Sequence, residues 1–355
     1  MSSKMKPISF YNNFQNRRHI IISHYHRPLF LKEDKQQLLS YLFYETNHNN
    51  CYDHFQIGFN CQNQKKIKII FTNKACVLAT ACLDLLCFYL NNQSIYFCLN
   101  LIKQFKDYLN NINLKNEEIL TKKYFFVLQE LIIFKKIYLQ KHRLSCFFIS
   151  LNLIEKVLKT IVLKNKLRLY FKKKLNQLNC WQRWYFSSQI AKKIINEIKN
   201  NKDSKIAIYL HQKFEVKTTR IIKYCFKNKI QVFVPKIKID ANENKSLVFV
   251  SWKKTSKFYY NRYHIQEPQD NENENEANFC FDAIIVPCLF FLKKEKKRCG
   301  YGYGYYDSYL QKLLIFNPKV KLWLLAFKNQ ELKNQKKIAQ LLQFERSISF
   351  SKIFF

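Results

Sequence analysis

Residues 298–307 read Arg-Cys-Gly-Tyr-Gly-Tyr-Gly-Tyr-Tyr-Asp, and they contain three of the only four glycines in the 355-residue chain. Glycine is needed where the backbone φ angle is positive or where a ligand contacts bare backbone. Successive turns of this kind can aim several N–H groups at one point, which suits phosphate oxygens. A structural turn usually needs one or two glycines rather than three at alternate positions. The run therefore predicts a phosphate-binding loop.

The sequence on either side of this run places it in an α/β domain. Residues 282–287 predict a buried central strand before the loop, and residues 305–313 predict a helix after it. A helix N-terminus offers free N–H groups and partial positive charge to a phosphate. No Lys-Ser/Thr pair follows the glycines, and their spacing is G-x-G-x-G. The loop is thus neither a Walker motif nor a Rossmann fingerprint.

Strand and helix patterns alternate from about residue 164 onward. Continuous apolar strands separated by helices indicate a parallel sheet that is covered on both faces. The fold class predicted for this half is a three-layer α/β domain with a mostly parallel sheet. Its other predicted strands are 206–210, 231–235, 247–252 and 322–327, its further helix is 218–227, and the polar tract 270–278 is a loop.

The N-terminal half predicts a smaller α+β domain. The expected domains are residues 1–158 and 159–355, and their join near 151–166 has no proline or glycine, so a helix is expected to run across it. The predicted strands are 55–59 and 66–71, and the predicted helices are 17–25, 75–90, 94–109 and most of 115–154.

The composition narrows the kinds of binding partner and the cellular compartment that are expected for this chain. The net charge of +36 fits either a polyanionic partner or compositional drift toward Lys, Asn, Ile, Phe and Tyr. Because the lysines are scattered along the whole chain, we favour drift, and we expect no nucleic-acid partner. The first residues predict no signal peptide despite twelve cysteines, so a reducing cytoplasm is expected. The longest apolar run, 75–90, contains Asp84 and is too short for a membrane span, so no membrane partner is expected.

The glycine run resembles the signature Arg-x-Gly-Tyr-Gly-x-Gly-Tyr-Tyr-Asp of the 5-formyltetrahydrofolate cyclo-ligase family, also called methenyltetrahydrofolate synthetases. The resemblance extends in order over most of residues 164–330. The further matching segments are Lys164–Arg168 (Lys-x-x-Leu-Arg), 214–219 (Glu-Val-Asp-Thr), 265–268 (Ile-x-Glu-Pro), 282–291 (the central strand) and 324–327 (Gly-x-Ala-Phe). Lys217 and Leu292 replace family acids, Cys288 replaces a glycine, and residues 343–355 lack a closing His-Asp stretch.

This resemblance implies ATP-dependent cyclisation of 5-formyltetrahydrofolate to 5,10-methenyltetrahydrofolate, with Mg²⁺ and release of ADP and phosphate. It assigns the folate to Glu215, Tyr305 and Tyr306, and catalysis to Lys164, Arg168, Tyr305, Tyr306 and Asp307. The residues that it assigns to ATP are Lys164, Arg168, Arg298, Gly300, Tyr301, Gly302, Tyr303, Gly304 and Asp307. The residues alone fit other roles equally: a solvated helix face for Lys164 and Arg168, a surface carboxylate for Glu215, and packing for the tyrosines.

Three cysteines and one aspartate are candidate metal ligands in the N-terminal half: Cys51, Asp53, Cys76 and Cys146. Three thiolates and one carboxylate suit tetrahedral Zn²⁺ or an iron–sulfur cluster. A helix N-terminus at Cys76 and the charge of Arg143 near Cys146 favour the thiolate. The alternative is that these cysteines are small buried hydrophobes.

Four segments of this half resemble SufU/IscU-type iron–sulfur scaffold proteins over residues 14–158. They are 24–28 (His-Tyr-x-x-Pro), 50–53 (x-Cys-Gly-Asp), 75–81 (Gly-Cys-x-Ile-Ser-x-Ala) and 143–146 (Arg-Ile-Lys-Cys). The resemblance implies that Cys51, Asp53, Cys76 and Cys146 bind zinc, that Cys51 or Cys146 accepts sulfur, and that a cysteine desulfurase is the partner. Cysteines 61, 82, 87 and 98 match nothing and are expected in the core, and His24 is expected to be structural.

The predicted function is therefore a cyclo-ligase fused to a sulfur-acceptor domain. One alternative is a cyclo-ligase whose N-terminal domain is a decayed docking module. The other is a basic nucleic-acid-binding protein, which predicts salt-dependent binding but leaves the glycine run unexplained.

Overall fold

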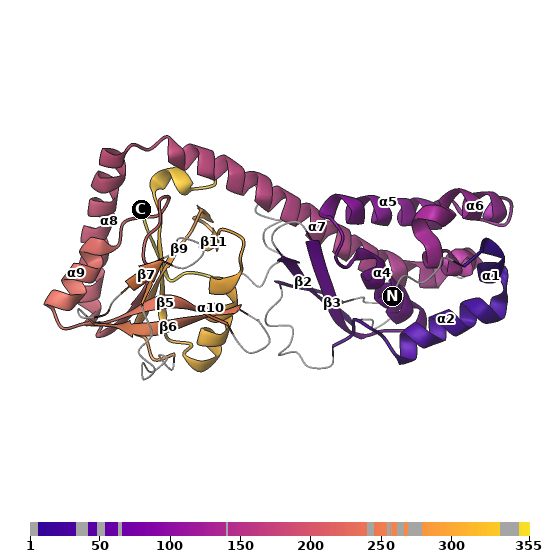
Figure 1. Cartoon of the computed structure of the whole chain (residues 1–355), viewed down its shortest axis with the longest axis horizontal. Coiled ribbons are helices and arrows are strands. Elements are labelled where there is room, and N and C mark those ends of the chain that lie inside the picture. The colour runs from indigo at the N-terminus through magenta and orange to yellow at the C-terminus, as the bar shows by residue number, and fades with distance from the viewer. Residues whose placement is uncertain are drawn as a thin grey trace. The chain divides into compact units, whose positions relative to one another are not determined.

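The computed structural model of the chain forms two compact units (Figure 1). Unit 1 extends to Leu163, and unit 2 begins at Lys164. The structure describes residues 6–32, 42–47, 54–62, 66–139, 141–239, 245–253, 256, 258–260, 266–268, 279–333 and 348–355.

Unit 1 combines an antiparallel three-stranded sheet with several helices. The strands are β1 (Leu42–Asn47), β2 (His54–Gln62) and β3 (Lys66–Lys74), in the order β1-β2-β3. The helices are α1 (Ile8–Asn12), α2 (Phe14–His26), α4 (Val77–Leu90), α5 (Ile95–Asn111), α6 (Glu117–Leu128), the 3₁₀ helix η1 (Gln129–Leu139) and the first part of α7 (Lys141–Asn176). In β3 the isoleucines at 67 and 69 are buried while Lys66 and Lys68 are exposed, because successive side chains of a strand point to opposite faces.

His24 has a structural role in unit 1, because it pairs with the buried carboxylate of Asp84. Asp84, inside the apolar helix α4, is fully buried and lies 2.7 Å from Nδ1 of His24, and it also accepts the backbone N–H of Phe30 at 2.9 Å. A buried carboxylate needs such partners. His24 is thus structural, as predicted.

Unit 2 is built on a six-stranded sheet in the order β13-β12-β9-β4-β5-β6. The strands are β4 (Lys205–Ile208), β5 (Gln231–Ile239), β6 (Lys245–Trp252), β9 (Ala283–Pro287), β12 (Lys321–Leu325) and β13 (Lys352–Phe354). The other elements are α8 (Cys180–Asn201), α9 (Thr219–Lys227), α10 (Tyr305–Phe316), the short pairs β7 (Phe258–Tyr260) with β8 (Gln266–Pro268) and β10 (Phe290–Leu292) with β11 (Lys297–Cys299), and the 3₁₀ helix η2 (Lys328–Gln330).

Both faces of this sheet are covered, as the continuous apolar strands predicted. Ile206 and Ile208 of β4 pack in one core with Phe171 of α7 and residues of α8 and α9, whereas Ala207 packs in a second core with Leu310 of α10. Figure 1 shows α8 and α9 on one side of the strands and α10 on the other. The three-layer α/β fold is confirmed.

One strand of this mostly parallel sheet is antiparallel, and the mostly parallel prediction is confirmed. β6 pairs antiparallel with β5, while β4, β5, β9, β12 and β13 pair in parallel. Only residues 240–244 connect β5 to β6, and so short a connection cannot make the crossover that parallel pairing needs.

Helix α7 spans the join predicted at residues 151–166, since no proline or glycine interrupts it. Its last part, from Lys164, belongs to unit 2. No helix in the described part of the chain is both long and apolar enough to cross a bilayer.

Replacing Asp282, which precedes β9, tests how the sheet is held. Its carboxylate accepts hydrogen bonds from the backbone N–H of Ser204 (2.7 Å) and of Lys205 (2.9 Å) and from the Ser204 hydroxyl (2.9 Å). Although partial burial opposes ionisation, these bonds lower the pKa of Asp282. We expect Asp282→Ala to lower the free energy of unfolding by about 1–3 kcal/mol at pH 7.

The loss should shrink as the pH falls through the lowered pKa of Asp282, because protonation weakens the same bonds in the parent chain. Urea unfolding followed by tryptophan fluorescence measures it, since all four tryptophans lie between residues 181 and 323 in unit 2. Asp282→Asn, which keeps one acceptor oxygen, is the control. A loss independent of pH would contradict the assignment.

Candidate functional site

The glycine loop begins at the end of a small hairpin and ends at the first residue of a helix. The sequence suggested that the loop directly follows the central strand β9. This was wrong, because the hairpin β10–β11 lies between β9 and the loop. Gly302 has φ +114°, and Gly304, the N-cap of α10, has φ +75°. Other residues adopt the φ of Gly302 only with strain, whereas that of Gly304 lies in the left-handed region, which favours glycine and also admits asparagine. A Cβ on Gly300 would lie 2.8 Å from Nη1 of Arg298, so a larger residue there would displace the end of that side chain.

Helix α7 reaches the loop through Arg168. Its Nε donates to the carbonyl of Gly300 at 3.0 Å, and its Nη1 donates to Asn165 at 2.7 Å. Lys164, one turn earlier on α7, is buried, with 6% of its surface exposed. The two basic residues of the opening motif are therefore not a solvated helix face, because one is buried and the other is bonded to the loop 132 residues away.

Arg298 organises the other side of the loop. Its side chain is 5% exposed; Nη2 pairs with Asp307 at 2.6 Å, and Nη1 donates to the carbonyl of Pro287, the last residue of β9, at 3.3 Å. The guanidinium lies 5.4 Å from the ring centre of Tyr306. Its Nε is buried and has no hydrogen-bond partner. A buried donor of this kind is costly unless a ligand or water satisfies it.

Glu215 lies beyond the end of β4 and is buried, with 7% of its surface exposed. It accepts the backbone N–H of Gln212 at 2.7 Å. Burial raises the pKa of Glu215 to about 7, although that hydrogen bond and Tyr301 act in the opposite direction. The carboxyl group therefore exists in both protonation states near neutral pH, unlike a surface carboxylate.

Three tyrosines surround this carboxyl group. Burial raises the pKa of Tyr209, Tyr301 and Tyr306, and in each case the charge of Glu215 is the next cause. The hydroxyl of Tyr209 donates to the Val216 carbonyl at 2.9 Å. The hydroxyl of Tyr301 is buried and makes no hydrogen bond of ordinary geometry. Arg298 Nε thus leaves a buried polar atom at the site for a ligand to satisfy, while the Tyr301 hydroxyl interacts with Glu215.

Tyr209 was missed by the sequence reasoning. It follows the aliphatic strand β4 and is 2% exposed, so it read as a core residue. A tyrosine at the end of an otherwise aliphatic run was the available signal, since a buried hydroxyl needs a partner. The other tyrosines of the loop differ in their surroundings. Tyr303 is exposed and stacks on Tyr305 with ring centres 5.9 Å apart, whereas Tyr306 packs against both cores.

Of the four predicted metal ligands, the structure describes the side chain of Cys76 alone, so it does not show whether the four come together. Cys51 and Asp53 lie outside the described residues, and Cys146 lies in α7 with an undescribed side chain. Cys76 is exposed and is the N-cap of α4. No group of three His, Cys, Asp or Glu side chains suited to a metal occurs among the residues that the structure describes. Cys82, Cys87 and Cys98 are buried core thiols, as predicted, and the side chain of Cys61 is not described.

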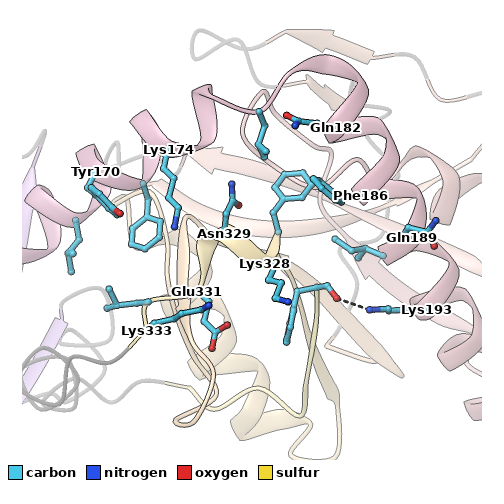
Figure 2. A pocket seen from close by; sticks show the side chains of 17 residues that line it. Tyr170, Lys174, Gln182, Phe186, Gln189, Lys193, Lys328, Asn329, Glu331 and Lys333 are labelled. Atoms are coloured by element: carbon cyan, nitrogen blue, oxygen red, sulfur yellow. Dashed lines mark hydrogen bonds between the residues drawn. The ribbon is translucent and has the colours of Figure 1, made fainter.

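A cavity of about 970 Å³ lies elsewhere in unit 2, between α7, α8 and residues 327–333 (Figure 2). None of the residues predicted for ATP or folate lines it.

Known proteins match the half of the chain that carries these motifs. The model of the 5-formyltetrahydrofolate cyclo-ligase family matches residues 160–335. The mouse 5-formyltetrahydrofolate cyclo-ligase is 31% identical over 173 residues, which are 47% of this chain and 83% of the mouse protein. This chain belongs to the 5-formyltetrahydrofolate cyclo-ligase family. The cyclo-ligase of Saccharomyces cerevisiae is 26% identical over 149 residues, 38% of this chain and 69% of the yeast protein. The predicted enzyme class is confirmed.

Solved structures resemble the two halves separately. The 5,10-methenyltetrahydrofolate synthetase of Mycoplasma pneumoniae is 20% identical and covers 54% of this chain and 97% of its own, with a TM-score of 0.40. A putative iron–sulfur cluster assembly scaffold protein of the SUF system from Fervidobacterium islandicum is 16% identical and covers 38% of this chain and 91% of its own, with a TM-score of 0.31. Membership of the cyclo-ligase family rests on the sequence relatives.

The raised pKa of the buried Glu215 predicts how the stability of the folded chain depends on pH. Because its pKa is raised in the folded state, the folded chain holds a proton that the unfolded chain releases between about pH 4.5 and 7. Stability is therefore lost as the pH rises through this range. Relative to the parent, we expect Glu215→Gln to gain about 2–3 kcal/mol in free energy of unfolding between pH 5 and pH 8.

Urea unfolding at the two pH values measures this gain. Glu295→Gln removes a carboxylate from the turn between β10 and β11 and is the control. An equal effect of Glu215→Gln at both pH values would show that burial does not hold the pKa of this group near 7.

Proposed function

We propose that unit 2 cyclises 5-formyltetrahydrofolate with ATP at a site made of the glycine loop, the basic face of α7 and Glu215. The observation that carries this assignment is the hydrogen bond from Arg168 to the Gly300 carbonyl. It joins two motifs that the family shares and that lie far apart in the sequence. The roles below follow from the contacts around that bond.

ATP binds with its phosphates at the loop. The N–H groups at the start of α10 and the charges of Lys164, Arg168 and Arg298 neutralise the phosphate oxygens. ATP arrives as its Mg²⁺ complex, which proteins commonly hold through phosphates and one or two carboxylates. Asp307, with 45% of its side chain exposed beside Arg298, is the carboxylate placed to contact that ion. Phosphoryl transfer needs this charge neutralisation and positioning more than covalent help.

The folate binds on the Glu215 side. The carboxyl group can donate or accept a hydrogen bond near neutral pH, and the Tyr301 hydroxyl beside it offers a second polar contact. Tyr305 and Tyr306 at the start of α10 supply ring contacts. These groups orient the formyl oxygen toward the γ-phosphate.

The reaction then has two steps. The formyl oxygen on N5 attacks the γ-phosphorus and ADP leaves, which turns a poor electrophile into an activated imidate. N10 adds to the formyl carbon and loses its proton, and the C–O bond breaks with release of phosphate. The product is the 5,10-methenyl ring. The residues of the chain neutralise charge and align the atoms for both steps.

Substitutions in the loop test this assignment. Gly302→Val should abolish ATP binding and cyclisation with little loss of fold, because valine is strained at φ +114° and would displace the loop N–H groups. Gly304→Asn is the matched control, since asparagine tolerates φ +75° and nothing lies within 4 Å of a Cβ there. We expect the control to retain most activity.

The measurement is the absorbance of the methenyl product formed from 5-formyltetrahydrofolate, ATP and Mg²⁺. No product from well-folded parent chain would overturn the proposed reaction. Unchanged ATP affinity in Gly302→Val would show that the loop is only structural.

We further propose that unit 1 is a SufU-like sulfur-acceptor domain with Cys51, Asp53, Cys76 and Cys146 as zinc ligands and a cysteine desulfurase as partner. The supporting observation is Cys76, which is exposed at the N-terminus of α4, where the helix dipole stabilises a thiolate. Three thiolates and a carboxylate complete a tetrahedral site.

Metal content tests this second proposal. We expect one zinc ion per chain, lost in Cys51→Ser and retained in Cys87→Ser, whose sulfur is fully buried in α4. Elemental analysis of purified full-length chain measures both. A metal-free parent chain would favour the alternative, a docking module that has lost its ligands.

A further inference from the structure

The first two turns of α8 expose an unusual group of aromatic side chains, here called the aromatic platform: Trp181, Trp184, Tyr185 and Phe186. Their exposed fractions are 65%, 56%, 40% and 41%. The chain contains only four tryptophans. Of the other two, Trp323 is buried, and Trp252 packs against Phe226. Drift toward Lys, Asn, Ile, Phe and Tyr does not explain tryptophan at an exposed helix face.

Part of the platform is already stacked. The rings of Trp181 and Tyr185 lie 5.4 Å apart with an interplanar angle of 8°. They are one helical turn apart, as is Trp184 from Trp181, so the three share one face of α8. Trp181 and Tyr185 cover one face of each other, yet much of the ring surface of the platform remains in water.

The segment around the platform is strongly cationic. Between Lys164 and Asn196 the chain has nine lysines and arginines and no aspartate or glutamate. Lys173 and Lys174 stand in the last turn of α7 and Lys172 just before that turn, a few residues ahead of α8. No acid within this stretch offsets the charge of these side chains.

The cavity of Figure 2 adjoins the platform, because Phe186 lines it. Its floor is apolar, with Phe171, Ile190 and Phe327. Four lysines and one acid line it: Lys174, Lys193, Lys328, Lys333 and Glu331. Asn329 points into it between Lys174 and Phe186, and the buried Oδ1 of Asn329 has no hydrogen-bond partner.

These features select one kind of partner. A second copy of the chain is disfavoured, because two such cationic surfaces repel each other. A lipid surface is disfavoured, because the exposed apolar groups are confined to two turns, whereas the aliphatic stripe of α8 (Ile190, Ile194 and Ile198) is buried in the core. Flat aromatic faces among lysines suit the bases and phosphates of a single-stranded nucleic acid.

Although the scattered lysines of the sequence predicted no nucleic-acid partner, we propose that the α7–α8 corner of unit 2 binds single-stranded nucleic acid. One base stacks on the aromatic platform, the phosphates contact the lysines at the end of α7, and a neighbouring base enters the cavity, where Asn329 accepts a hydrogen bond from its edge. This surface is separate from the glycine loop and Glu215, so the cyclo-ligase reaction does not depend on it.

Fluorescence anisotropy of the full-length chain with labelled 12-nucleotide RNA and DNA single strands tests the proposal. We expect the double variant Trp181→Ala/Trp184→Ala to lower the affinity at least tenfold, because each stacked base contributes strongly to binding. Its control, Ile315→Ala/Phe316→Ala, removes exposed apolar side chains from the end of α10 and should leave the affinity unchanged. Both variants should retain cyclo-ligase activity, which shows that they fold.

The salt dependence of single-strand binding tests the role of the lysines at the end of α7. The triple variant Lys172→Gln/Lys173→Gln/Lys174→Gln should flatten the slope of log affinity against log salt by about 2, from three lost phosphate contacts. The triple variant Lys223→Gln/Lys227→Gln/Lys319→Gln makes the same change in net charge elsewhere in unit 2 and should leave the slope nearly unchanged.

Two outcomes would overturn the proposal. One is equal loss of affinity in the platform variants and their controls, which would mean that binding follows net charge alone. The other is that Trp181→Ala/Trp184→Ala abolishes co-sedimentation with anionic phosphatidylglycerol vesicles while single-strand binding persists, which would make the platform a lipid-binding surface.

Discussion

The parallel pairing of β4 with β9 is the constraint on which the proposed cyclo-ligase site depends. Ile208 lies opposite Ile285 in the register, so the two chains leave the sheet at the same edge. Beyond β4 the chain reaches Glu215, and beyond β9 it forms the β10–β11 hairpin, Arg298 and the glycine loop. The carboxyl ends of parallel strands gather loops in this way in many α/β proteins. Two segments about ninety residues apart therefore become one site.

The same edge explains the unusual electrostatics of that site. Glu215 is surrounded by Tyr209, Tyr301 and Tyr306, and the guanidinium of Arg298 lies against Tyr306. Burial keeps the pKa of Glu215 near 7, and Arg298 keeps one donor without a partner. Such unsatisfied groups weaken a folded protein unless a ligand completes them. The cost is understandable at a site whose substrates carry phosphates, a formyl oxygen and ring nitrogens.

Helix α7 serves more than one surface of unit 2. Arg168 is bonded to the glycine loop, whereas Phe171 and Lys174, less than two turns later, line the cavity next to α8. A straight helix presents neighbouring residues to different directions, so a single cationic segment can face both.

The sequence by itself predicted the three layers and suggested the chemistry of the loop, although β1, α8 and β13 were not among the predicted elements. Apolar strands between helices predicted the three layers, and three glycines in a glycine-poor chain predicted the phosphate loop, because period and glycine content reflect local physics. The sequence also predicted correctly that His24 is structural and that Cys82, Cys87 and Cys98 lie in the core. It could not foresee that β6 would run antiparallel or that a hairpin would precede the loop, since strand partners depend on connections and contacts across the sheet.

Only the tertiary structure decided which residues share the site. Glu215 read as a surface carboxylate and Tyr209 as core, because burial and neighbours are properties of packing rather than of a residue's type. Arg168 could have been a solvated cation until its bond to Gly300 was seen. The exposure of Trp181 and Trp184 was hidden for the same reason: an apolar pattern predicts a buried face, and only the packed helices show which apolar side chains are left in water.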